Sequence, residues 1–445
     1  MRVSRLLRPS TIHEDRGATA IITAVIMTSL LSIGALTIDY GAASHVRRQT
    51  QNAADATTRS IVENCAKQAA AAGQNVLDGA CVSATGTADA STIVQGNAPG
   101  SAPDAPVIGG AGREVSVTVA EPVDYRLAQL LGKDSDVVRS SATAEWTNLR
   151  PVEGFPVVPF GVAQCTYNDF RPSAGNVDGA RTLIRSDVLQ TVRSLVNNAT
   201  GLLSGIAGFL RGILFPVNDL IGAITGSDAE CGDGSANDVL AMQGGAWLTE
   251  AIDLDLVGAS CDIDTRIGVL LYASSTLHDV LTSRCAARFG TQIRAGDTIL
   301  LPIYRPKEVL TNVTGALGLS IQACGSGVSG NCVKVPPNLG AEIVGYAPFK
   351  VTGWRFGSNS SSDPLAPTCN NITISLPLQQ LLSQLLLVGP LLNFVLGLLG
   401  FTVVEASVGC NGIQGYFTKS FTKDPNFEYA ADGADFGAGL VRLKN

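Results

Sequence analysis

The chain has 445 residues, of which 16% are charged, and a net charge of −7 at pH 7. That length allows two or three domains with sizeable cores, whereas the acidic balance and the lack of a basic run beyond residue 48 exclude the electrostatic footprint of a nucleic-acid-binding protein. The 48 glycines, 20 prolines and 6% aromatic residues favour short strands and many turns, with helices as additions.

The first predicted element is an uncharged apolar helix over residues 18–38. At about 1.5 Å of rise per residue it spans roughly 30 Å, the hydrocarbon thickness of a bilayer. Residues 1–17 form a basic leader, which predicts a cytoplasmic N-terminus and an extracytoplasmic remainder. A cleaved signal peptide is the alternative, because small residues follow at positions 42–44, but the apolar run exceeds the roughly 7–15 residues of a signal sequence. We therefore expect a retained transmembrane anchor.

The helix is expected to continue beyond the anchor, since only Gly41 weakens it before Gly73 and no proline intervenes. Small and apolar residues then recur at three- or four-residue steps, the spacing of one helical face. These residues are Val46, Thr50, Ala53, Thr57, Ile61 and Cys65. The opposite face is charged and polar, so the outer half of the rod is predicted to be amphipathic and to cover one face of a sheet.

A specific motif surrounds the anchor. An arginine–glycine pair precedes the apolar span, an aspartate ends it, and the run RRQTQNAADA follows closely. The motif consists of Arg16, Gly17, Asp39, Arg47, Arg48, Gln49, Gln51, Asn52, Ala53, Ala54, Asp55 and Ala56. It resembles the N-terminal signature of TadE/TadG-like Flp pilus-assembly proteins.

Members of that family are membrane-anchored, pilin-like components of the tight-adherence pilus and secretion machinery. The resemblance therefore implies a pilin-like α+β fold, a place in the bacterial inner (cytoplasmic) membrane, and contacts with other pilus or secretion components. It implies neither catalysis nor a cofactor. Cleavage after Gly17 would put Ile22 at the fifth position of the product, where processed pilins carry glutamate, so we expect an unprocessed, TadG-like anchor.

The exported region is predicted to contain strands in two parts, residues 39–164 and residues 165–445. Residues 114–119 alternate polar and apolar with a period of two, the pattern of a half-buried strand. Residues 84–112, rich in small residues and proline, are expected to form a surface loop. Further strands are predicted at 140–146, 156–162, 298–304, 341–356, 412–421 and 439–443, the last four in the second part.

Two apolar helical insertions are predicted in the second part, at residues 183–225 and 376–404. The second insertion is apolar enough to be considered as another membrane span. A crossing would leave Cys410 and the strand at 412–421 in the cytoplasm, so a helical hairpin with both ends outside is preferred. Because such an apolar surface is costly in a soluble monomer, we expect at least one insertion to be an assembly contact.

All ten cysteines lie beyond the anchor, and their even number indicates structural disulfides in an oxidising compartment. Zinc is the alternative, but the chain has no C-x2-C pair and its three histidines are isolated. Spacing does not determine connectivity, and we propose sequential pairing. The pairs are Cys65–Cys81, Cys165–Cys231, Cys261–Cys285, Cys324–Cys332 and Cys369–Cys410.

No catalytic, cofactor-binding or metal site is predicted. Residues 325–330 match G-x-G-x-x-G, but they lie between two cysteines of a tight loop, not between a strand and a helix. His278 and Asp279 are neighbours, but a triad would need a serine beside them in space. A cluster of aspartates offers oxygen ligands for Ca²⁺, yet lacks the full loop pattern, so solvated strand edges are preferred. The cluster is Asp253, Asp255, Asp262 and Asp264.

The sequence therefore predicts a membrane-anchored structural protein of a pilus or secretion apparatus, with no small-molecule substrate. The alternative is an envelope enzyme, ligand-binding protein or adhesin whose pilin-like N-terminus serves only for export. A pocket that unites His278 with a serine and a carboxylate, or a filled metal site near residues 253–264, would favour that alternative.

Overall fold

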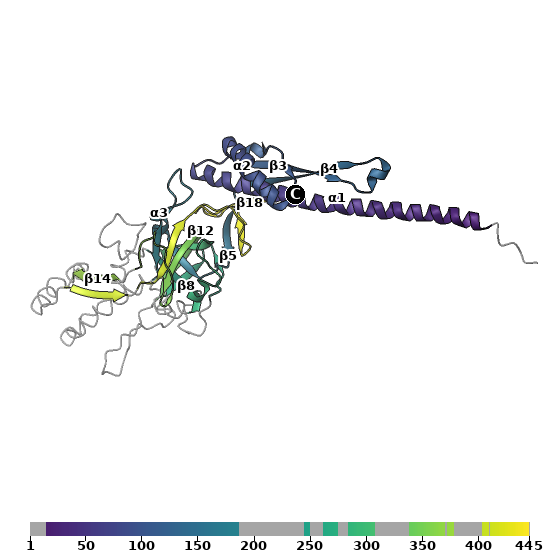
Figure 1. Ribbon diagram of the computed structural model, residues 1–445. Coiled ribbons are helices and arrows are strands. Elements are labelled where there is room, and N and C mark those ends of the chain that lie inside the picture. Colours follow the sequence, from purple (N-terminus) through teal and green to yellow (C-terminus); the bar gives the residue numbers. More distant parts are fainter. Residues whose placement is uncertain are drawn as a thin grey trace, which may run out of the picture. The chain divides into compact units, whose positions relative to one another are not determined.

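The computed structural model describes residues 15–186, 244–249, 261–274, 284–307, 338–369, 372–377, 403–408 and 410–444 (Figure 1). These residues form an α+β fold with antiparallel-rich sheets and disulfides, as the sequence predicts. The chain divides into two compact units. Unit 1 comprises residues 1–66, 76–146 and 441–445, and unit 2 comprises residues 67–75 and 147–440. The division follows residue 146, not residue 164, and the C-terminal end of the chain belongs to unit 1.

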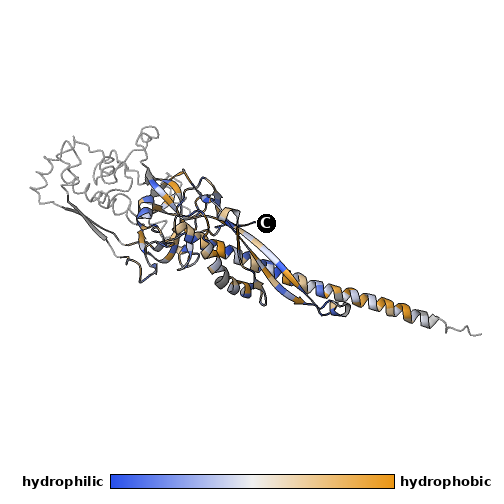
Figure 2. Cartoon of the chain, turned by 90° about the horizontal axis from the view of Figure 1, so that it is seen from above, coloured by the Kyte–Doolittle hydropathy of each residue, from blue (hydrophilic) through white to orange (hydrophobic). Residues whose placement is uncertain are grey.

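Helix α1 (Asp15–Ala71) is one continuous helix of 57 residues, so the anchor and its continuation form the single rod that the sequence predicts. Its N-terminal half exposes large apolar side chains, such as Leu31 at 73% (Figure 2). Its second half instead buries small and apolar side chains, among them Ala53, Ala54 and Ile61, each at 0% exposed. The helix thus changes from an uncovered apolar rod to an amphipathic one.

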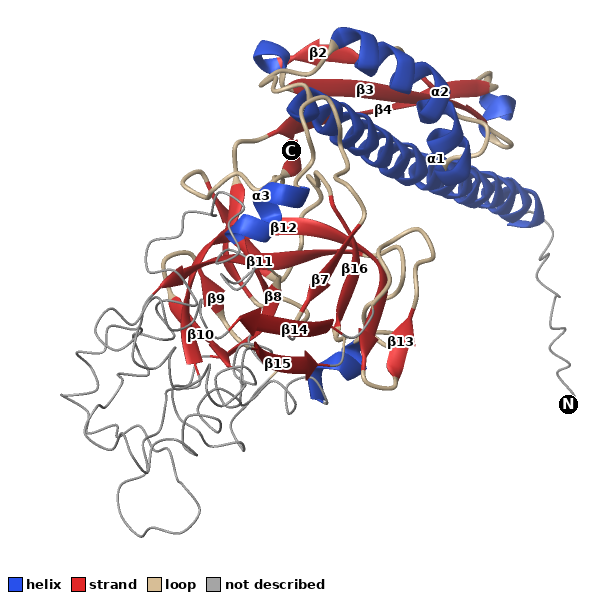
Figure 3. Cartoon of the chain, turned by 90° about the vertical axis from the view of Figure 1, so that its left-hand side faces the viewer, coloured by secondary structure: helices blue, strands red, loops and turns tan. Residues whose placement is uncertain are grey.

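Helix α2 (Gly79–Asn97) occupies about the first half of the segment in which the sequence predicts a loop (Figure 3). The loop prediction for residues 84–112 is wrong because the alanines of this small-residue segment are strong helix formers and because the helix is capped and packed. Asp78 caps it by accepting a hydrogen bond from the Ala80 backbone N–H at 2.9 Å, and Val94 is fully buried. Only the end of the segment is extended, in β1 (Ala102–Pro103) and β2 (Val107–Gly109).

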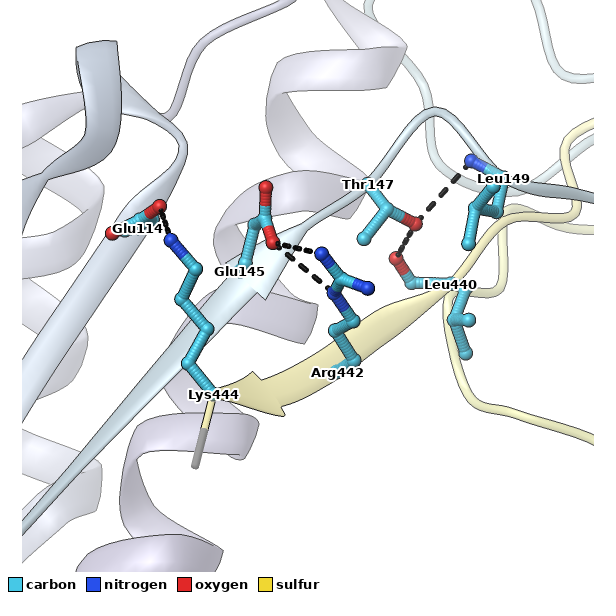
Figure 4. Close-up of polar contacts among 7 residues, drawn as sticks. All are labelled: Glu114, Glu145, Thr147, Leu149, Leu440, Arg442 and Lys444. Atoms are coloured by element: carbon cyan, nitrogen blue, oxygen red, sulfur yellow. Dashed lines mark hydrogen bonds and ion pairs between the residues drawn. The ribbon is translucent and has the colours of Figure 1, made fainter. Parts of the chain in front are cut away.

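The sheet of unit 1 is antiparallel, with strand order β1-β3-β4-β18 and β2 beside β3. Its two long strands are β3 (Glu114–Asp124) and β4 (Ser135–Trp146), which form a hairpin. The alternating burial along β3 confirms the period-two prediction. The last strand, β18 (Val441–Lys444), pairs with β4 (Figure 4). Val441 lies opposite Trp146. The assignment of residues 439–443 to the second sheet region is therefore wrong, because pairing between segments so distant in sequence leaves no local signal.

Unit 2 contains an eight-stranded sheet, with strand order β10-β8-β6-β11-β12-β16-β7 and β13 beside β12. The strands are β6 (Phe160–Ala163), β7 (Thr182–Arg185), β8 (Gly245–Thr249), β10 (Leu270–Ser274), β11 (Thr298–Lys307), β12 (Asn338–Phe356), β13 (Asn359–Ser361) and β16 (Gly412–Phe417). β10 also pairs with β12, so five strands (β10, β8, β6, β11 and β12) close a ring. Helix α3 (Gln164–Phe170) follows β6, and a second sheet contains β5 (Arg150–Gly154), β9 (Thr265–Arg266) and β17 (Phe427–Ala430).

Strand β11 is buried on both faces. Leu301 and Ile303 belong to a hydrophobic cluster that includes Trp247. Tyr304 belongs to a second cluster, which includes Tyr346. A strand covered on both sides has a continuous apolar sequence instead of an alternating one, which explains the unbroken apolar character of residues 298–304.

The predicted apolar insertions fall mostly outside the described residues. The described start of the first insertion, at residues 183–185, is strand β7 and not helix. The described ends of the second insertion belong to the antiparallel strands β14 (Ile372–Pro377) and β15 (Val403–Val408), with Leu376 opposite Val404. The helical prediction is therefore wrong at these ends, which lie side by side.

The disulfides among the described residues coincide with the sequential pairing. They are Cys65–Cys81 in unit 1 and Cys261–Cys285 and Cys369–Cys410 in unit 2. Cys165 is also disulfide-bonded. Its proposed partner, Cys231, and the proposed pair Cys324–Cys332 lie outside the described residues.

Candidate functional site: the anchor helix and the hairpin docked on it

The N-terminal half of α1 presents large apolar side chains that no other described element covers. Val25, Leu31 and Leu36 are 60%, 73% and 66% exposed. Such a surface is costly in water and is typical of a helix that meets lipid or another protein. From Thr19 onward the helix is long and apolar enough to cross a membrane, which agrees with the predicted anchor at residues 18–38.

The second half of α1 packs on the β3–β4 hairpin through small and hydroxyl-bearing side chains. Thr50 Oγ1 lies 2.8 Å from Ser140 Oγ, and both side chains are buried. Thr58 Oγ1 donates to the Ala54 carbonyl of its own helix at 2.7 Å and also lies 3.4 Å from the Ala142 carbonyl of β4. The fully buried Ala54 lies between these two contacts along the helix. A side chain larger than alanine at this buried position would have to find room in a packed interior.

Asp39, the residue that ends the apolar span, joins α1 to the tip of the hairpin. Its carboxylate accepts hydrogen bonds from three successive backbone N–H groups, those of Arg126 (3.1 Å), Leu127 (3.1 Å) and Ala128 (2.6 Å). Burial alone raises the pKa of this carboxyl, and it is the largest single influence, but the bonds from Ala128, Arg126 and Leu127 together hold the pKa below its usual value. The acid is therefore charged at neutral pH and fixes the tip against the helix.

Residues 17–60 match the family model described as putative Flp pilus-assembly TadE/G-like. The match therefore covers the exposed apolar half of α1, Asp39 and the helix face that packs on the hairpin. This segment of the chain is therefore similar to Tad pilus-assembly proteins. No curated protein and no solved structure matches the chain.

The structure divides the signature of the TadE/G-like segment into two groups. Asp39, Ala53 and Ala54 are buried against the rest of unit 1. Arg47, Arg48 and Asn52 are exposed. The remaining signature residues with described side chains are Gly17, which is exposed, and Gln49, Gln51, Asp55 and Ala56, which are partly buried. The buried group holds the hairpin, and the exposed group is open to a partner.

The partly buried Gln51 also joins the helix to the hairpin, since its Nε2 donates to Asp55 Oδ1 at 2.9 Å and to the Ser141 carbonyl at 3.4 Å. Sequence reasoning does not identify the hairpin partners of the TadE/G-like segment, namely Ser140 and the backbone of residues 126–128. The only available signal is the position of Asp39, an acid directly after an apolar span, which must find hydrogen-bond donors if it is to be buried.

Most of the other candidate residues lie outside the part of the chain that the structure describes. His278, Asp279, Asp253, Asp255 and residues 325–330 all lie outside the described residues. Asp262 forms an ion pair with Arg288 at 2.7 Å. Asp264 and Arg266 line an open depression of about 440 Å³. Within the described part of the chain, no three His, Cys, Asp or Glu side chains gather as a metal site would require.

Proposed function

We propose that this protein is a membrane-anchored structural component of a Tad (Flp-type) pilus or secretion apparatus, which acts through protein contacts and not through catalysis. The observation that carries this proposal is the TadE/G-like match over residues 17–60, on a helix with an uncovered apolar half and an amphipathic half that carries a sheet. The apolar half retains the protein in the membrane, and the hairpin on α1 gives unit 1 a fixed position relative to it.

We place the anchor in the bacterial inner membrane, with residues 1–17 in the cytoplasm and the chain from residue 39 onward outside. The four arginines of residues 1–17 support this orientation, since basic residues stay on the cytoplasmic side. Disulfides in both units, such as Cys65–Cys81 and Cys369–Cys410, support an oxidising compartment for each of them. The exposed arginines Arg47 and Arg48, which follow the span, are available to other apparatus components.

The test is an in-frame deletion in the native bacterium, complemented either by the full chain or by a released form in which residues 1–38 are replaced by a cleavable signal sequence. We expect the deletion to abolish assembled Flp-type pili or the secretion activity of the apparatus. The full chain should restore assembly, whereas the released form should not, because it lacks membrane retention.

Two results would contradict the proposal. Full restoration by the released form would show that the anchor is dispensable. Normal assembly in the deletion strain, with no apparatus component cross-linked to the chain, would favour an envelope enzyme, ligand-binding protein or adhesin that uses a pilin-like anchor for export.

A further inference from the structure

We propose that the tip of the β3–β4 hairpin is a second membrane contact, which lies in the lipid headgroup layer beside the anchor. The tip comprises residues 125–134 and includes the short 3₁₀ turn η2 (Ala128–Leu131). The inference rests on the proposed function in one respect, because it requires the first half of α1 to span the bilayer. Its ligand is the lipid surface itself.

Asp39 fixes the depth of the tip along α1. It directly follows the apolar residues 18–38 and therefore lies at the edge of the hydrocarbon core when that segment spans the membrane. Its carboxylate binds the backbone N–H groups of Arg126, Leu127 and Ala128. Since α1 is continuous through Asp39, the bonded part of the tip lies within about one helical turn, roughly 5 Å, of that edge.

The hairpin runs along α1 with its tip at the membrane end. Farther along the chain from Asp39, Thr50 contacts Ser140 and Thr58 contacts the carbonyl of Ala142. Residues with higher numbers on α1 therefore lie against residues with higher numbers on β4, farther from the tip. Figure 1 shows the hairpin lying along the helix in this way. From Asp39 to Thr58 the helix rises roughly 28 Å. The body of the hairpin therefore extends away from the bilayer, and only its tip reaches the headgroups.

The tip carries residue types that favour a membrane interface. Its sequence, YRLAQLLGKD, sets three leucines between Arg126 and Lys133. The Lys133 ammonium lies 5.4 Å from the centre of the Tyr125 ring, and Tyr40, beside the tip on α1, is 74% exposed. Tyrosine rings at the boundary and basic side chains that extend toward headgroups are typical of membrane-facing segments.

Charge does not make the tip selective for anionic lipid. Three aspartates in or directly beside the tip (Asp124, Asp134 and Asp136) outnumber its two basic residues, and Lys133 is paired with Asp136 at 2.7 Å. The contact therefore depends on the tyrosine-containing, apolar sequence of the tip and on the position that Asp39 imposes. We expect it to form on a zwitterionic bilayer as well as on an anionic one.

Tryptophan quenching by brominated lipid tests this inference on the full chain in phosphatidylcholine nanodiscs. Three single variants report on the tip (Gln129→Trp), the middle of the anchor (Ile26→Trp) and a control strand (Val107→Trp). Gln129 and Val107 are both exposed. Val107 pairs with Ser116 of β3, which precedes Asp124, the last residue of β3, by eight residues. Val107 therefore lies roughly 27 Å from the tip. The three native tryptophans are buried and supply a common background.

The tip tryptophan should have a blue-shifted emission because it lies in lipid, and bromine near the lipid carbonyls should quench it. Bromine deep in the chains should quench Ile26→Trp most, and Val107→Trp should keep its emission with both lipids. Quenching of Ile26→Trp without any quenching at the tip would overturn the tip contact and leave the anchor intact. A tip emission that is blue-shifted but not quenched would overturn it in favour of a protein neighbour. Equal quenching at the tip and at Val107 would also overturn it. Absence of quenching in Ile26→Trp would instead refute the membrane-anchored function.

Discussion

Asp39 shows how a single residue sets the register between a helix and a sheet. Its carboxylate has three backbone donors from consecutive residues, so the tip cannot slide along α1 without leaving all of them unpaired. Backbone N–H groups, unlike an arginine side chain, also have no rotamer freedom to lose when they bind. A charge at the end of an apolar span is thus satisfied by the part of the fold that it positions.

Acid should loosen the hairpin tip. The pKa of Asp39 in the folded protein lies below the ordinary value of 3.8. Its contribution to stability is therefore complete above pH 3.8 and is lost as the pH falls through the lower, folded value. We expect amide exchange at Arg126, Leu127 and Ala128, corrected for the intrinsic rate, to accelerate only in that acidic range.

Asp39→Asn is the matched control, because the asparagine side chain keeps one acceptor oxygen and does not titrate. The three tip amides should exchange faster than in the native chain at neutral pH and show no additional acceleration in acid. If the variant retained the acid response, the effect would belong to another carboxylate of the tip, such as Asp124 or Asp134, and the role assigned to Asp39 would be wrong.

At the scale of elements, the sequence predicts helices and strands well where one periodic pattern dominates. α1 follows from an apolar run, a three- or four-residue repeat and the lack of proline, and β3 follows from its strict alternation. α2 does not, because its serines, threonines and glycines resemble a loop, and its stability comes from Asp78 and from burial of Val94. Those contacts require the rest of unit 1, which no local pattern describes.

Close packing between α1 and β4 should make Ala54→Leu destabilising. Ala54 is fully buried between the contacts made by Thr50 and Thr58, so a leucine must displace the strand or adopt a strained rotamer. We expect unit 1 to lose about 1–3 kcal/mol of unfolding free energy. Pulse proteolysis in urea on the detergent-solubilised chain measures this loss.

Asn52→Leu adds a similar side chain at an exposed position of the same helix and should change the unfolding free energy of unit 1 by no more than about 0.5 kcal/mol. Equal losses in the two variants would indicate that leucine itself, and not the close approach of β4, causes the effect.

At the scale of the whole molecule, unit 1 is built from three chain segments, the last of which follows all of unit 2. The sequence predicts a strand near residue 440 but cannot assign its partner, because Arg442 and Glu145 are 297 residues apart. The candidate site has the same limit. Signature residues such as Asp39 are recognisable by their pattern, whereas Ser140 and the tip backbone become partners only through tertiary packing.

Deleting residues 441–445 should therefore destabilise unit 1, although it removes only the end of the chain. Val441 is 2% exposed and pairs with Trp146, so loss of its burial alone costs roughly 1.5–3 kcal/mol, and the edge of β4 becomes unpaired.

In the control, Arg442→Ala with Lys444→Ala keeps the strand but removes its ion pairs with Glu145 and Glu114 (Figure 4). These pairs are largely exposed and contribute weakly, so the control should resemble the native chain in pulse proteolysis of unit 1. If the control were as unstable as the deletion, charge and not strand pairing would close this sheet. If the deletion left the unfolding free energy of unit 1 unchanged, the contribution of β18 would be refuted.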